Sequence, residues 1–493
     1  MQLNNVVIVG GGTAGWLTAL YADRLFPLSK ITVVASSEIG ILGAGEGTTV
    51  DFIRFLDELD IPISDIIKHA NGTIKSGIKF SNWNGDGNSY FHSFLIKKYI
   101  DDINMYKDEI HEGNNLDEVQ FTSASALRDK VLYKKGSLEN VCSDALHFDA
   151  NLLARYLEGV GVNRGIKLID EEVSDIVSDS DGYISSLVMK SGNSIDAAFV
   201  FDCTGFKRLI IGNFYKGKWH SYAGSLPVNR AMPFFISNQG ENLPPYTEAI
   251  AMKHGWMWKI PTQGRYGCGY VFDDAFASDD DIKQEVEEYL GHSITSPRMF
   301  SFNAGCYENV WIKNCIAIGL SSGFTEPLEA TSIWVSIQTL ELINHKINGI
   351  LERDLQAIAD FNGTIRNMNE EVVSFLHFHY LTDRQDSKFW KTFSDKTKTP
   401  EMVRNLSEIA ATTLPTQRDI NYITMLLETR TSPNYIQTFD IADWYTIGAG
   451  TKFFKSNFEK PLVDKISYKR MISEKITELI SHMDYLEILR NEN

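Results

Sequence analysis

Three glycines near the start of the chain have the spacing of a phosphate-binding turn. Gly10, Gly12 and Gly15 form a Gly-x-Gly-x-x-Gly pattern, with Thr13 and Ala14 between the last two. In such a turn the first glycine allows a tight bend, the second lets a pyrophosphate approach the backbone, and the third lets helix and strand pack closely. The free N–H groups and positive dipole of the following helix attract the anion. We therefore expect a nucleotide cofactor to bind here.

A second candidate anion site lies where a helix is expected to begin. The apolar strand at 315–320 is followed by a turn and then by helical spacing to about Leu342. Thr331 and Ser332 would lie at the helix start, where unpaired N–H groups can bind a small anion. Glu329 stands beside them. By itself this carboxylate is interpreted as a partner of the helix dipole, and the alternative is that it faces a group that needs a carboxylate.

Three further groups of residues could contact a ligand, although each has an ordinary structural interpretation. Lys75 is by default a solvated lysine, and His92 and Phe94 lie in an aromatic run typical of a core strand. Trp256 and Trp258 alternate along an expected strand, so both point to one face, which could merely be core. From the residue types alone, we prefer the structural interpretation for all three groups.

The glycine turn requires one strand before it and another after its helix. The apolar runs 6–9 and 31–35 supply these strands. The acidic residue expected at the end of the second strand is Ala35 instead, so Ser36 or Glu38 would have to contact the ribose. This departure weakens an NAD interpretation more than a flavin interpretation, because a flavin is usually held by several further segments.

Later segments are expected to return to the same ligand. The glycine-rich stretch 43–49 predicts a loop close to it, and the strand at 198–202 ends in Asp-x-Thr-Gly. A second pass of backbone near the cofactor favours FAD over NAD. The residues that we assign to cofactor binding are Gly10, Gly12, Thr13, Ala14, Gly15, Ser36, Glu38, Gly45, Glu46, Ile318 and Gly319.

Composition excludes several other classes of function. The 493 residues hold 47 Lys and Arg against 64 Asp and Glu, a net charge of -17, without a long basic stripe, so nucleic acid and anionic membrane are poor partners. The five cysteines are scattered without paired metal spacing, which predicts a reducing compartment, no disulfides and no metal site. No apolar stretch reaches about 18 residues, and the first residues lack a basic segment. We expect a cytoplasmic protein that does not bind membranes.

The remaining secondary structure is expected to be mixed. Residues 145–159 predict an amphipathic helix, and the pattern is mainly helical from about residue 354. The longer helices are expected at 355–375 and 465–489. No internal repeat and no clear linker divides the chain, so any domains should pack closely together.

Several of these stretches together resemble the flavin-dependent tryptophan halogenase family. The stretches are the glycine turn through Trp16, Gly45-Glu46-Gly47-Thr48, residues 75–83, Trp256-x-Trp258-x-Ile260-Pro261 and Glu326-Pro327-Leu328-Glu329. The Trp-x-Trp-x-Ile-Pro element is the specific one, because many flavoproteins share the glycine pattern. Similarity covers most of residues 3–390 and fades in the last hundred.

The resemblance implies an α/β fold with an FAD-binding GR2-type Rossmann-like module, a β-sheet substrate region and a mainly helical C-terminal part. It places the FAD-binding and halide module in residues 1–345, with inserted substrate-facing segments near 85–140. Residues 346–493 would form the helical region packed on it. The oligomeric state is left open, and a homo-oligomer is one alternative.

The family's chemistry implies roles for two charged residues. FADH2, supplied by a separate flavin reductase, reacts with O2 and a chloride, bromide or iodide ion to yield hypohalous acid. This oxidant passes through an internal tunnel to an aromatic substrate. The lysine matching Lys75 hydrogen-bonds the oxidant or forms a haloamine, since a desolvated lysine can act as an amine near neutral pH. The glutamate matching Glu329 stabilises the cationic intermediate or accepts its proton.

The resemblance also implies binding residues for the halide and for the aromatic ring. Thr331 and the backbone at Ser332 match the halide position, and Trp256 and Trp258 match the shield that keeps substrate away from the flavin. His92 and Phe94 match the aromatic sandwich that contacts the substrate ring in the family.

Two departures from the family pattern bear on specificity. The family usually shows Ser-Thr-Gly after the catalytic glutamate, whereas this chain has Ala330-Thr331-Ser332, so halide preference could differ from chloride. No convincing amino-acid clamp is found around 435–454. We therefore expect an indole, phenol or larger heteroaromatic substrate and not free tryptophan. The alternatives are an FAD-dependent aromatic monooxygenase and a catalytically silent flavin-binding protein.

Overall fold

The first strand and helix form where the glycine pattern predicts them. In the computed structural model, strand β1 (Asn5–Val9) leads through the glycine turn into helix α1 (Thr13–Leu25). The structure describes residues 3–40, 46–94, 101–142, 144–226, 228–238, 242–295, 299–392, 399–431 and 437–492. Strand β1 is buried, and its residues pair on both sides with parallel strands.

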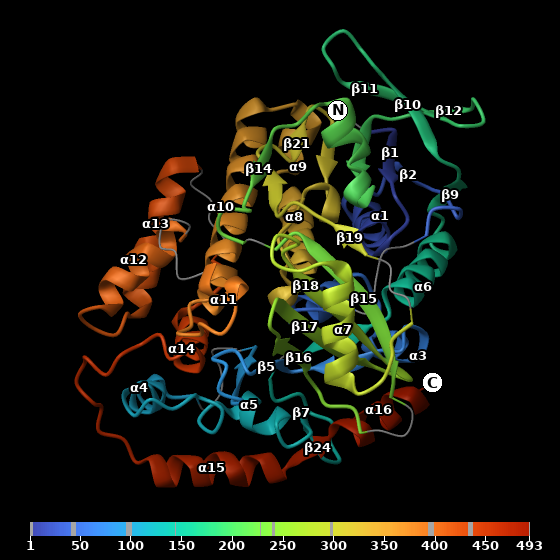
Figure 1. Cartoon of the computed structure of the whole chain (residues 1–493). Helices are drawn as coiled ribbons and strands as arrows, with labels where there is room; N and C mark the ends of the chain where they lie inside the picture. Colours follow the sequence, from blue (N-terminus) through green and yellow to red (C-terminus); the bar gives the residue numbers. More distant parts are fainter. Residues whose placement is uncertain are drawn as a thin grey trace.

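A six-stranded sheet holds the glycine turn at the carboxyl ends of its parallel strands. The strand order is β21-β22-β13-β1-β2-β9, and only β21 runs antiparallel. The bounds are β2 Lys30–Ala35, β9 Lys167–Asp170, β13 Phe199–Asp202, β21 Trp311–Ile312 and β22 Cys315–Ala317. Helices α1, α6 (Ala150–Asn163) and α8 (Thr331–His345) pack near this sheet (Figure 1). The predicted α/β fold with a Rossmann-like module is confirmed.

A second sheet, of seven strands, forms the β-rich middle of the molecule. Its order is β19-β15-β18-β17-β16-β5-β6. The bounds are β5 Gly77–Ser81, β6 Ser89–Ser93, β15 Arg230–Ser237, β16 Thr247–Ala251, β17 Gly255–Thr262, β18 Arg265–Phe272 and β19 Phe300–Ser301. Strands β17 and β18 form the expected hairpin. Helix α7 (Asp279–Leu290) lies across this sheet (Figure 1).

A small three-stranded sheet connects the glycine-rich region to Lys75. It contains β3 (Glu46–Gly47), β8 (Ala145–Phe148) and β4 (Thr73–Lys75), with β8 in the middle. The prediction of one helix over 145–159 is therefore wrong at its start. Asp149 ends the strand and caps α6, because its carboxylate accepts from the backbone N–H groups of Asn151 and Leu152.

Three other small sheets complete the β structure. One is the projecting β10–β12 group at the top right of Figure 1, with β10 Val173–Ser178, β11 Ile184–Met189 and β12 Ser194–Asp196. A second joins β14 Trp219–Ser221, β20 Gly305–Tyr307 and β23 Gly323–Phe324. The third pairs β7 Lys130–Lys134 with β24 Leu479–Ser481.

Helices dominate after residue 346, as predicted. They are α9 Ile347–Glu352, α10 Leu355–His379, α11 Lys388–Thr392, α12 Glu401–Ala410, α13 Gln417–Thr431, α14 Ile441–Gly450, α15 Lys465–Thr477 and α16 His482–Asn491. The single helix expected over 465–489 is wrong, since β24 separates α15 from α16. Earlier helices are α2 Asp51–Glu58, α3 Ile63–His69, α4 Ile103–His111 and α5 Phe121–Ala126.

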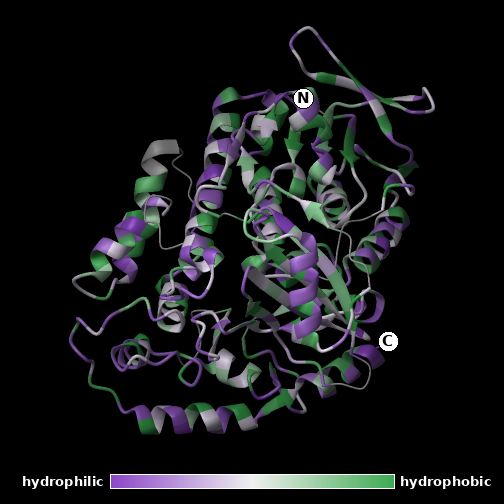
Figure 2. Cartoon of the chain, viewed as in Figure 1, coloured by the Kyte–Doolittle hydropathy of each residue, from purple (hydrophilic) through white to green (hydrophobic). Residues whose placement is uncertain are grey.

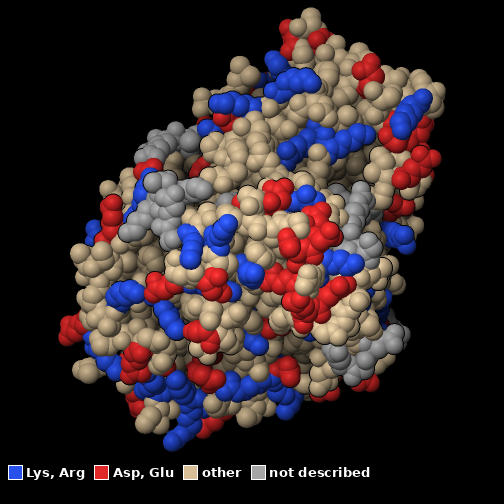
Figure 3. Space-filling view, viewed as in Figure 1, with Lys and Arg blue, Asp and Glu red and all other residues tan. Residues whose placement is uncertain are grey.

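One hydrophobic core continues across the two parts of the chain. The rings of Trp311 and Phe361 lie 5.2 Å apart, and residues from β1 to α16 belong to the same buried cluster. Figure 2 shows the apolar residues concentrated on the inner strands and on one side of the outer helices. On the face drawn in Figure 3, acidic side chains gather over α7, whose first turn carries three aspartates. Among the described residues, no helix is long and apolar enough to cross a membrane.

Candidate active site

The glycine turn has the shape that a pyrophosphate requires. A Cβ on Gly10 would lie 2.1 Å from the carbonyl oxygen of Cys203, and one on Gly15 would lie 2.0 Å from that of Gly10. A Cβ on Gly12 would meet no atom within 4 Å, so the turn faces open space there. Helix α1 has no side-chain cap and no acidic residue in its first turn. Its free N–H groups can therefore donate hydrogen bonds to an anion, and the glycine turn fits the phosphates of a dinucleotide such as FAD.

The other residues assigned to the cofactor lie around this turn. Ser36 and Glu38 follow β2, and the hydroxyl of Ser36 accepts from the Glu38 backbone N–H at 3.3 Å. Ile318 and Gly319 follow β22, and a Cβ on Gly319 would lie 2.9 Å from the Cβ of Ala14. The carboxyl ends of the parallel strands β1, β2 and β22 thus lie at one edge of the sheet, as expected for a nucleotide site.

Glu46 lies in the small sheet that also carries Lys75, since β3 and β4 both pair with β8. Burial and then the nearby charge of Asp149 raise the pKa of Glu46 to about 7. Glu46 begins β3, and the chain then passes through Gly47 to Thr48. Gly45 lies outside the described residues.

The candidate halide site lies at the start of α8. Its N-cap residue, Ala330, has a left-handed backbone and provides no side-chain cap. Thr331 and Ser332 border a small cavity of about 20 Å³, together with Gly319, Ser322, Gly323, Phe324, Thr325, Val335, Asn369 and Val372. This volume is that of a site for one water-sized particle. The cavity therefore joins the helix start to Gly319 on the cofactor side.

Lys75 is buried, contrary to the interpretation preferred from its residue type alone. The residue is only 1% exposed, and its Nζ donates a 2.9 Å hydrogen bond to the Thr48 carbonyl. A Cβ on Gly47 would lie 3.1 Å from Nζ, so the 46–48 segment packs directly against the lysine. Nζ also lies 4.8 Å from the centre of the Phe94 ring. Burial lowers the pKa of Lys75 to about 7, although the charge of Glu329 opposes this shift.

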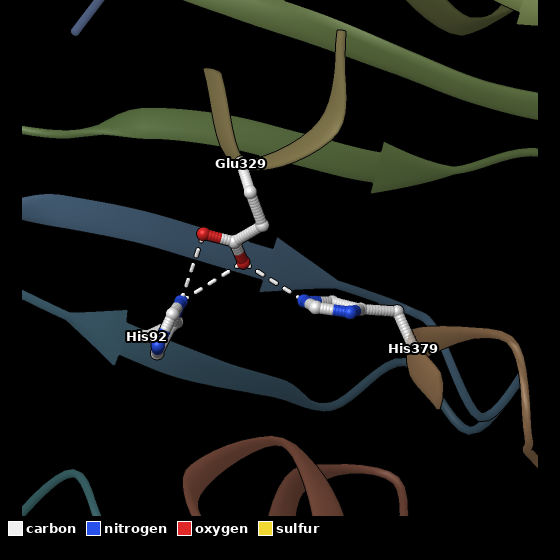
Figure 4. Close-up of side chains that lie close together, drawn as sticks. All are labelled: His92, Glu329 and His379. Atoms are coloured by element: carbon white, nitrogen blue, oxygen red, sulfur yellow. Dashed lines mark hydrogen bonds and ion pairs between the residues drawn. The ribbon is translucent and has the colours of Figure 1, made fainter. Parts of the chain in front are cut away.

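Glu329 contacts two histidines (Figure 4). Its Oε1 and Oε2 each lie 2.9 Å from Nδ1 of His92, and Oε1 lies 2.8 Å from Nε2 of His379. Glu329 and Ala330 both have left-handed backbone angles, with φ of 64° and 55°. This costly conformation turns the chain between Glu329 and helix α8. Burial would raise the pKa of Glu329, but the two imidazoles outweigh it and hold the pKa well below its usual range.

His92 lies in β6 with both ring nitrogens facing carboxylates. Nε2 lies 3.2 Å from Oδ1 of Asp443, a residue of α14. Burial lowers the pKa of His92, but the two carboxylates raise it to about 10. One ring contact is with Phe375, at 5.5 Å between centres.

The side chains of His92, His379 and Glu329 are also of the types that bind metal ions. Their ligand atoms lie within 4.8 Å of one another. The N···O separations between them are those of direct hydrogen bonds. The expectation of no metal stays a prediction.

Trp256 and Trp258 lie close together on β17, as their alternation predicts. Their ring centres are 6.1 Å apart, and both rings are buried. Trp256 Nε1 donates to Glu326 Oε2 at 3.1 Å, and the Tyr380 hydroxyl donates to the same oxygen at 2.6 Å. Glu326 therefore connects the tryptophan strand to α10 and to the turn that carries Glu329.

The structure thus arranges the assigned residues in two groups. Thr331 and Ser332 share a cavity with Gly319, whereas Lys75 and Glu329 interact electrostatically and contact Phe94 and His92, respectively. Sequence reasoning assigned no role to His379, Asp443 or Glu326. Asp443 has no distinctive signal, because it stands three residues after Asp440 in an ordinary capping box.

Comparison with known proteins identifies the family. Residues 5–467 match the model of the tryptophan halogenase family. The chain is 32% identical over 421 residues to tryptophan 6-halogenase SttH of Streptomyces toxytricini, covering 79% of this chain and 80% of the relative. It is 30% identical to tryptophan 7-halogenase RebH of Lentzea aerocolonigenes, covering 79% of this chain and 78% of the relative.

A solved structure shows the same fold over almost the whole length. BrvH, a flavin-dependent halogenase from Brevundimonas sp. BAL3, superimposes with a TM-score of 0.85 at 27% identity. The match covers 99% of this chain and 99% of that chain.

Proposed function

The chain belongs to the tryptophan halogenase family and is a flavin-dependent halogenase, and from this premise we propose that it halogenates an electron-rich aromatic ring through Lys75 and Glu329. The proposal includes FADH2 supplied by a separate reductase, O2 as the oxidant source, and a cytoplasmic location. It also includes the division into a cofactor and halide module over residues 1–345 and a helical region over 346–493.

The observation that carries the proposal is the burial of Lys75 beside the segment that leads from the cofactor region. When bound, FADH2 would supply two electrons to O2, so that FADH2, O2, a halide ion and a proton give FAD, hypohalous acid and water. Lys75 is held by the Thr48 carbonyl, so its nitrogen has a fixed position next to the 46–48 segment. Thr331 and Ser332 would bind the halide on the cofactor side, through the N–H groups at the start of α8.

Lys75 would deliver the halogen to the ring. The low pKa favours the neutral amine, which can take the halogen from hypohalous acid. A nitrogen–halogen bond forms as the halogen–oxygen bond breaks, and the amine proton leaves with hydroxide as water. The aromatic carbon then takes the halogen from nitrogen, and the proton lost from the ring restores the amine. A charged Lys75 that only hydrogen-bonds the oxidant is the alternative.

Glu329 would stabilise positive charge on the substrate. Its carboxylate is held ionised by two imidazoles, so it can face the cationic ring that forms when the halogen adds. The same low pKa makes it a weaker proton acceptor. Electrostatic stabilisation is therefore the role that we assign first, and proton transfer is the second.

The substrate that we propose is an indole, phenol or larger heteroaromatic and not free tryptophan. Two relatives are named as tryptophan halogenases, whereas BrvH is named only as a flavin-dependent halogenase. In the described part of 437–454, Asp443 contacts His92, and Trp444 packs against Phe375 in the core. Because Asp443 and Trp444 at the start of α14 contact residues of the protein interior, their side chains are not available to bind the amino and carboxyl groups of an amino acid.

Four aromatic side chains have proposed roles in separating the substrate from the flavin and in contacting the substrate ring. Trp256 and Trp258 would keep the substrate away from the flavin. Phe94, with the face of the His92 ring, would contact the substrate. His92 makes its hydrogen bonds through the nitrogens at the ring edge, and these bonds leave the ring faces available for contact with a substrate.

A product screen by mass spectrometry tests this function. Purified protein is supplied with FAD, NADH, an unrelated flavin reductase and O2, and a panel of indoles, phenols and tryptophan is tested with chloride, bromide and iodide. We expect a halide-dependent mass gain on a substrate of the panel, abolished in Lys75→Ala although FAD still binds. Glu329→Gln should lower turnover by about a hundredfold, the usual loss of one electrostatic stabiliser.

Other outcomes would contradict the proposal. Unchanged turnover in Lys75→Ala would remove the lysine from the reaction. Oxygenated products without halogen would identify a monooxygenase. Tryptophan as the preferred substrate would overturn the proposed substrate class while leaving the halogenase intact.

A further inference from the structure

His92 stands in a chain of buried polar contacts that reaches from Glu329 to helix α14. Its Nδ1 lies 2.9 Å from both Glu329 oxygens, and its Nε2 lies 3.2 Å from Asp443 Oδ1. His92 is 2% exposed and the Asp443 side chain is 16% exposed. Water therefore has little access to the ring edges, and the two carboxylates must satisfy them.

The contacts require two ring protons. A neutral imidazole carries one N–H group and one lone pair, so it can donate to only one carboxylate. An ionised carboxylate only accepts hydrogen bonds. Burial raises the pKa of Asp443 to about 6, so above this pH both carboxylates are ionised and His92 satisfies both contacts only as the doubly protonated imidazolium. The direction of its pKa shift, raised to about 10 against the effect of burial, agrees with this geometry.

Helix α14 fixes the position of the second carboxylate. Asp440 caps the helix, and its backbone N–H donates to Oδ2 of Asp443 at 2.8 Å. This reciprocal capping box leaves Oδ1 directed at His92. The next residue, Trp444, is fully buried between Phe375 and Phe378. The core thus anchors the helix start that presents Asp443.

We propose that Asp443 is a positioning residue for halogenation: it keeps His92 doubly protonated, and His92 in turn holds the Glu329 carboxylate ionised and oriented. The inference rests on the proposed action of Glu329 on the substrate cation. Asp443 itself does not contact the reacting atoms in this scheme. Its effect reaches them through the N–H that His92 shares between both Glu329 oxygens.

Other titratable groups around His92 belong to five elements. The short turn carrying Glu329 and helix α14, with Asp440 and Asp443, contribute the acidic groups. Lys75 of β4 and Tyr90 of β6 interact electrostatically with Glu329. His379 of α10 contacts Glu329 at 2.8 Å and places its other nitrogen 2.7 Å from the Phe375 carbonyl. Only Asp443 and Glu329, among these described groups, hydrogen-bond the His92 ring itself.

The test compares Asp443→Asn with Asp440→Asn. Asparagine at 443 keeps a similar shape but removes the negative charge, so the His92 pKa should fall. Asparagine at 440 keeps a good helix cap and removes a nearby charge that does not touch His92. Thermal unfolding establishes that both variants fold, and Asp443→Glu serves as a second variant that restores the charge.

The first readout is the protonation of His92, followed by NMR of protein containing ¹⁵N-histidine. The His92 signals are assigned by their loss in His92→Gln. In wild type and Asp440→Asn the ring should remain doubly protonated through pH 8.5. In Asp443→Asn its apparent pKa should fall by about one unit or more, as for the loss of one close opposite charge. An unchanged titration in Asp443→Asn overturns the proposal.

The second readout is the pH profile of turnover from pH 6.5 to 9. Relative to wild type at the same pH, Asp443→Asn should lose about half of its turnover or more by pH 9, because His92 deprotonates and Glu329 loses the positive charge of its partner. Asp443→Glu should recover part of the wild-type profile. A loss that is equal at every pH would indicate a merely structural role and would overturn the inference. If wild type halogenates nothing, the proposed function fails, whereas the NMR titration still decides the coupling of Asp443 to His92.

Discussion

Two buried charged residues of the site, Lys75 and Glu329, are stabilised by different partners. Lys75 donates to a backbone carbonyl, whereas Glu329 accepts from two histidines. Among the described residues, no carboxylate lies within ion-pair distance of Nζ of Lys75. A buried lysine without a close counter-ion loses its proton easily, because burial disfavours the charged form. This separation of partners lets the amine and the carboxylate coexist near neutral pH.

The pH dependence of turnover should therefore follow the neutral form of Lys75. With a pKa of about 7, the amine fraction increases as pH rises from 6 to 8, so turnover should rise and then level. Rates are measured per FADH2 consumed, which separates halogen transfer from reduction. Lys75→Arg, which stays charged, is the control and should remain inactive throughout. Turnover that falls over this range would indicate instead that charged Lys75 acts as a hydrogen-bond donor.

Protein stability gives an independent check on the same group. The folded-state pKa of Lys75 is about 7 and the ordinary value is 10.5, so the unfolded chain binds more protons between these values. Stability from this residue is therefore lowest below pH 7 and rises with pH across that window. Lys75→Met should stabilise the protein more at pH 6 than at pH 10.

At the residue scale, sequence reasoning found Lys75, Glu329 and His92 but missed His379 and Asp443, which contact them. Lys75 and Glu329 were assigned only through the family resemblance, because a lone lysine or glutamate carries no local sign of burial. His379 and Asp443 lie 50 and more residues from Glu329 along the chain. Their contact depends on how α10 and α14 pack against β6, which no local pattern records. Whether each assigned residue acts as proposed remains a prediction.

At the scale of elements, the glycine turn was predictable because its constraints are local. Strand period, glycine spacing and helix period follow one another within about twenty residues, and all three indicate the same βα unit. The helix predicted over 145–159 failed at its start because β8 is central in a small sheet whose partners lie far away in sequence. Helical spacing at 465–489 likewise did not reveal β24, which forms by pairing with β7.

Two glycines of the turn should respond differently to the same added methyl group. Gly12→Ala places a Cβ in open space, so the fold should persist while the methyl group obstructs the approaching pyrophosphate. Gly15→Ala places a Cβ 2.0 Å from the Gly10 carbonyl and should force strand and helix apart. FAD affinity is measured by fluorescence titration and stability by thermal unfolding. We expect Gly12→Ala to lose at least tenfold in affinity with little change in stability, a loss of about 1.4 kcal/mol.

Gly15→Ala supplies the comparison. It should lower the unfolding temperature by several degrees, since overpacking a tight backbone contact costs about 1–3 kcal/mol. Full FAD affinity in Gly12→Ala would show that the phosphates do not approach that side of the turn.

At the scale of the whole molecule, oxidant formation and oxidant use are assigned to different places. The cavity proposed for the halide is lined by Gly319, Thr331 and Ser332, and Lys75 contacts the 46–48 segment. Trp256 and Trp258 are buried in the second sheet, and Glu326 links that sheet to the turn before α8. Because one core joins these parts, the relative position of the two places is fixed by the fold.

Removing the lysine should therefore release the oxidant instead of stopping its formation. In Lys75→Ala, the residues proposed for FAD and halide are unchanged, so hypohalous acid should still form and escape into solution. A halogen-accepting dye in the bulk solution should then react faster than with wild type and substrate, and only when halide is present. Catalase and a reaction without protein control for free peroxide. If the dye reacts no faster than in the reaction without protein, Lys75 is required for making the oxidant, and the assignment of the two steps to separate places is wrong.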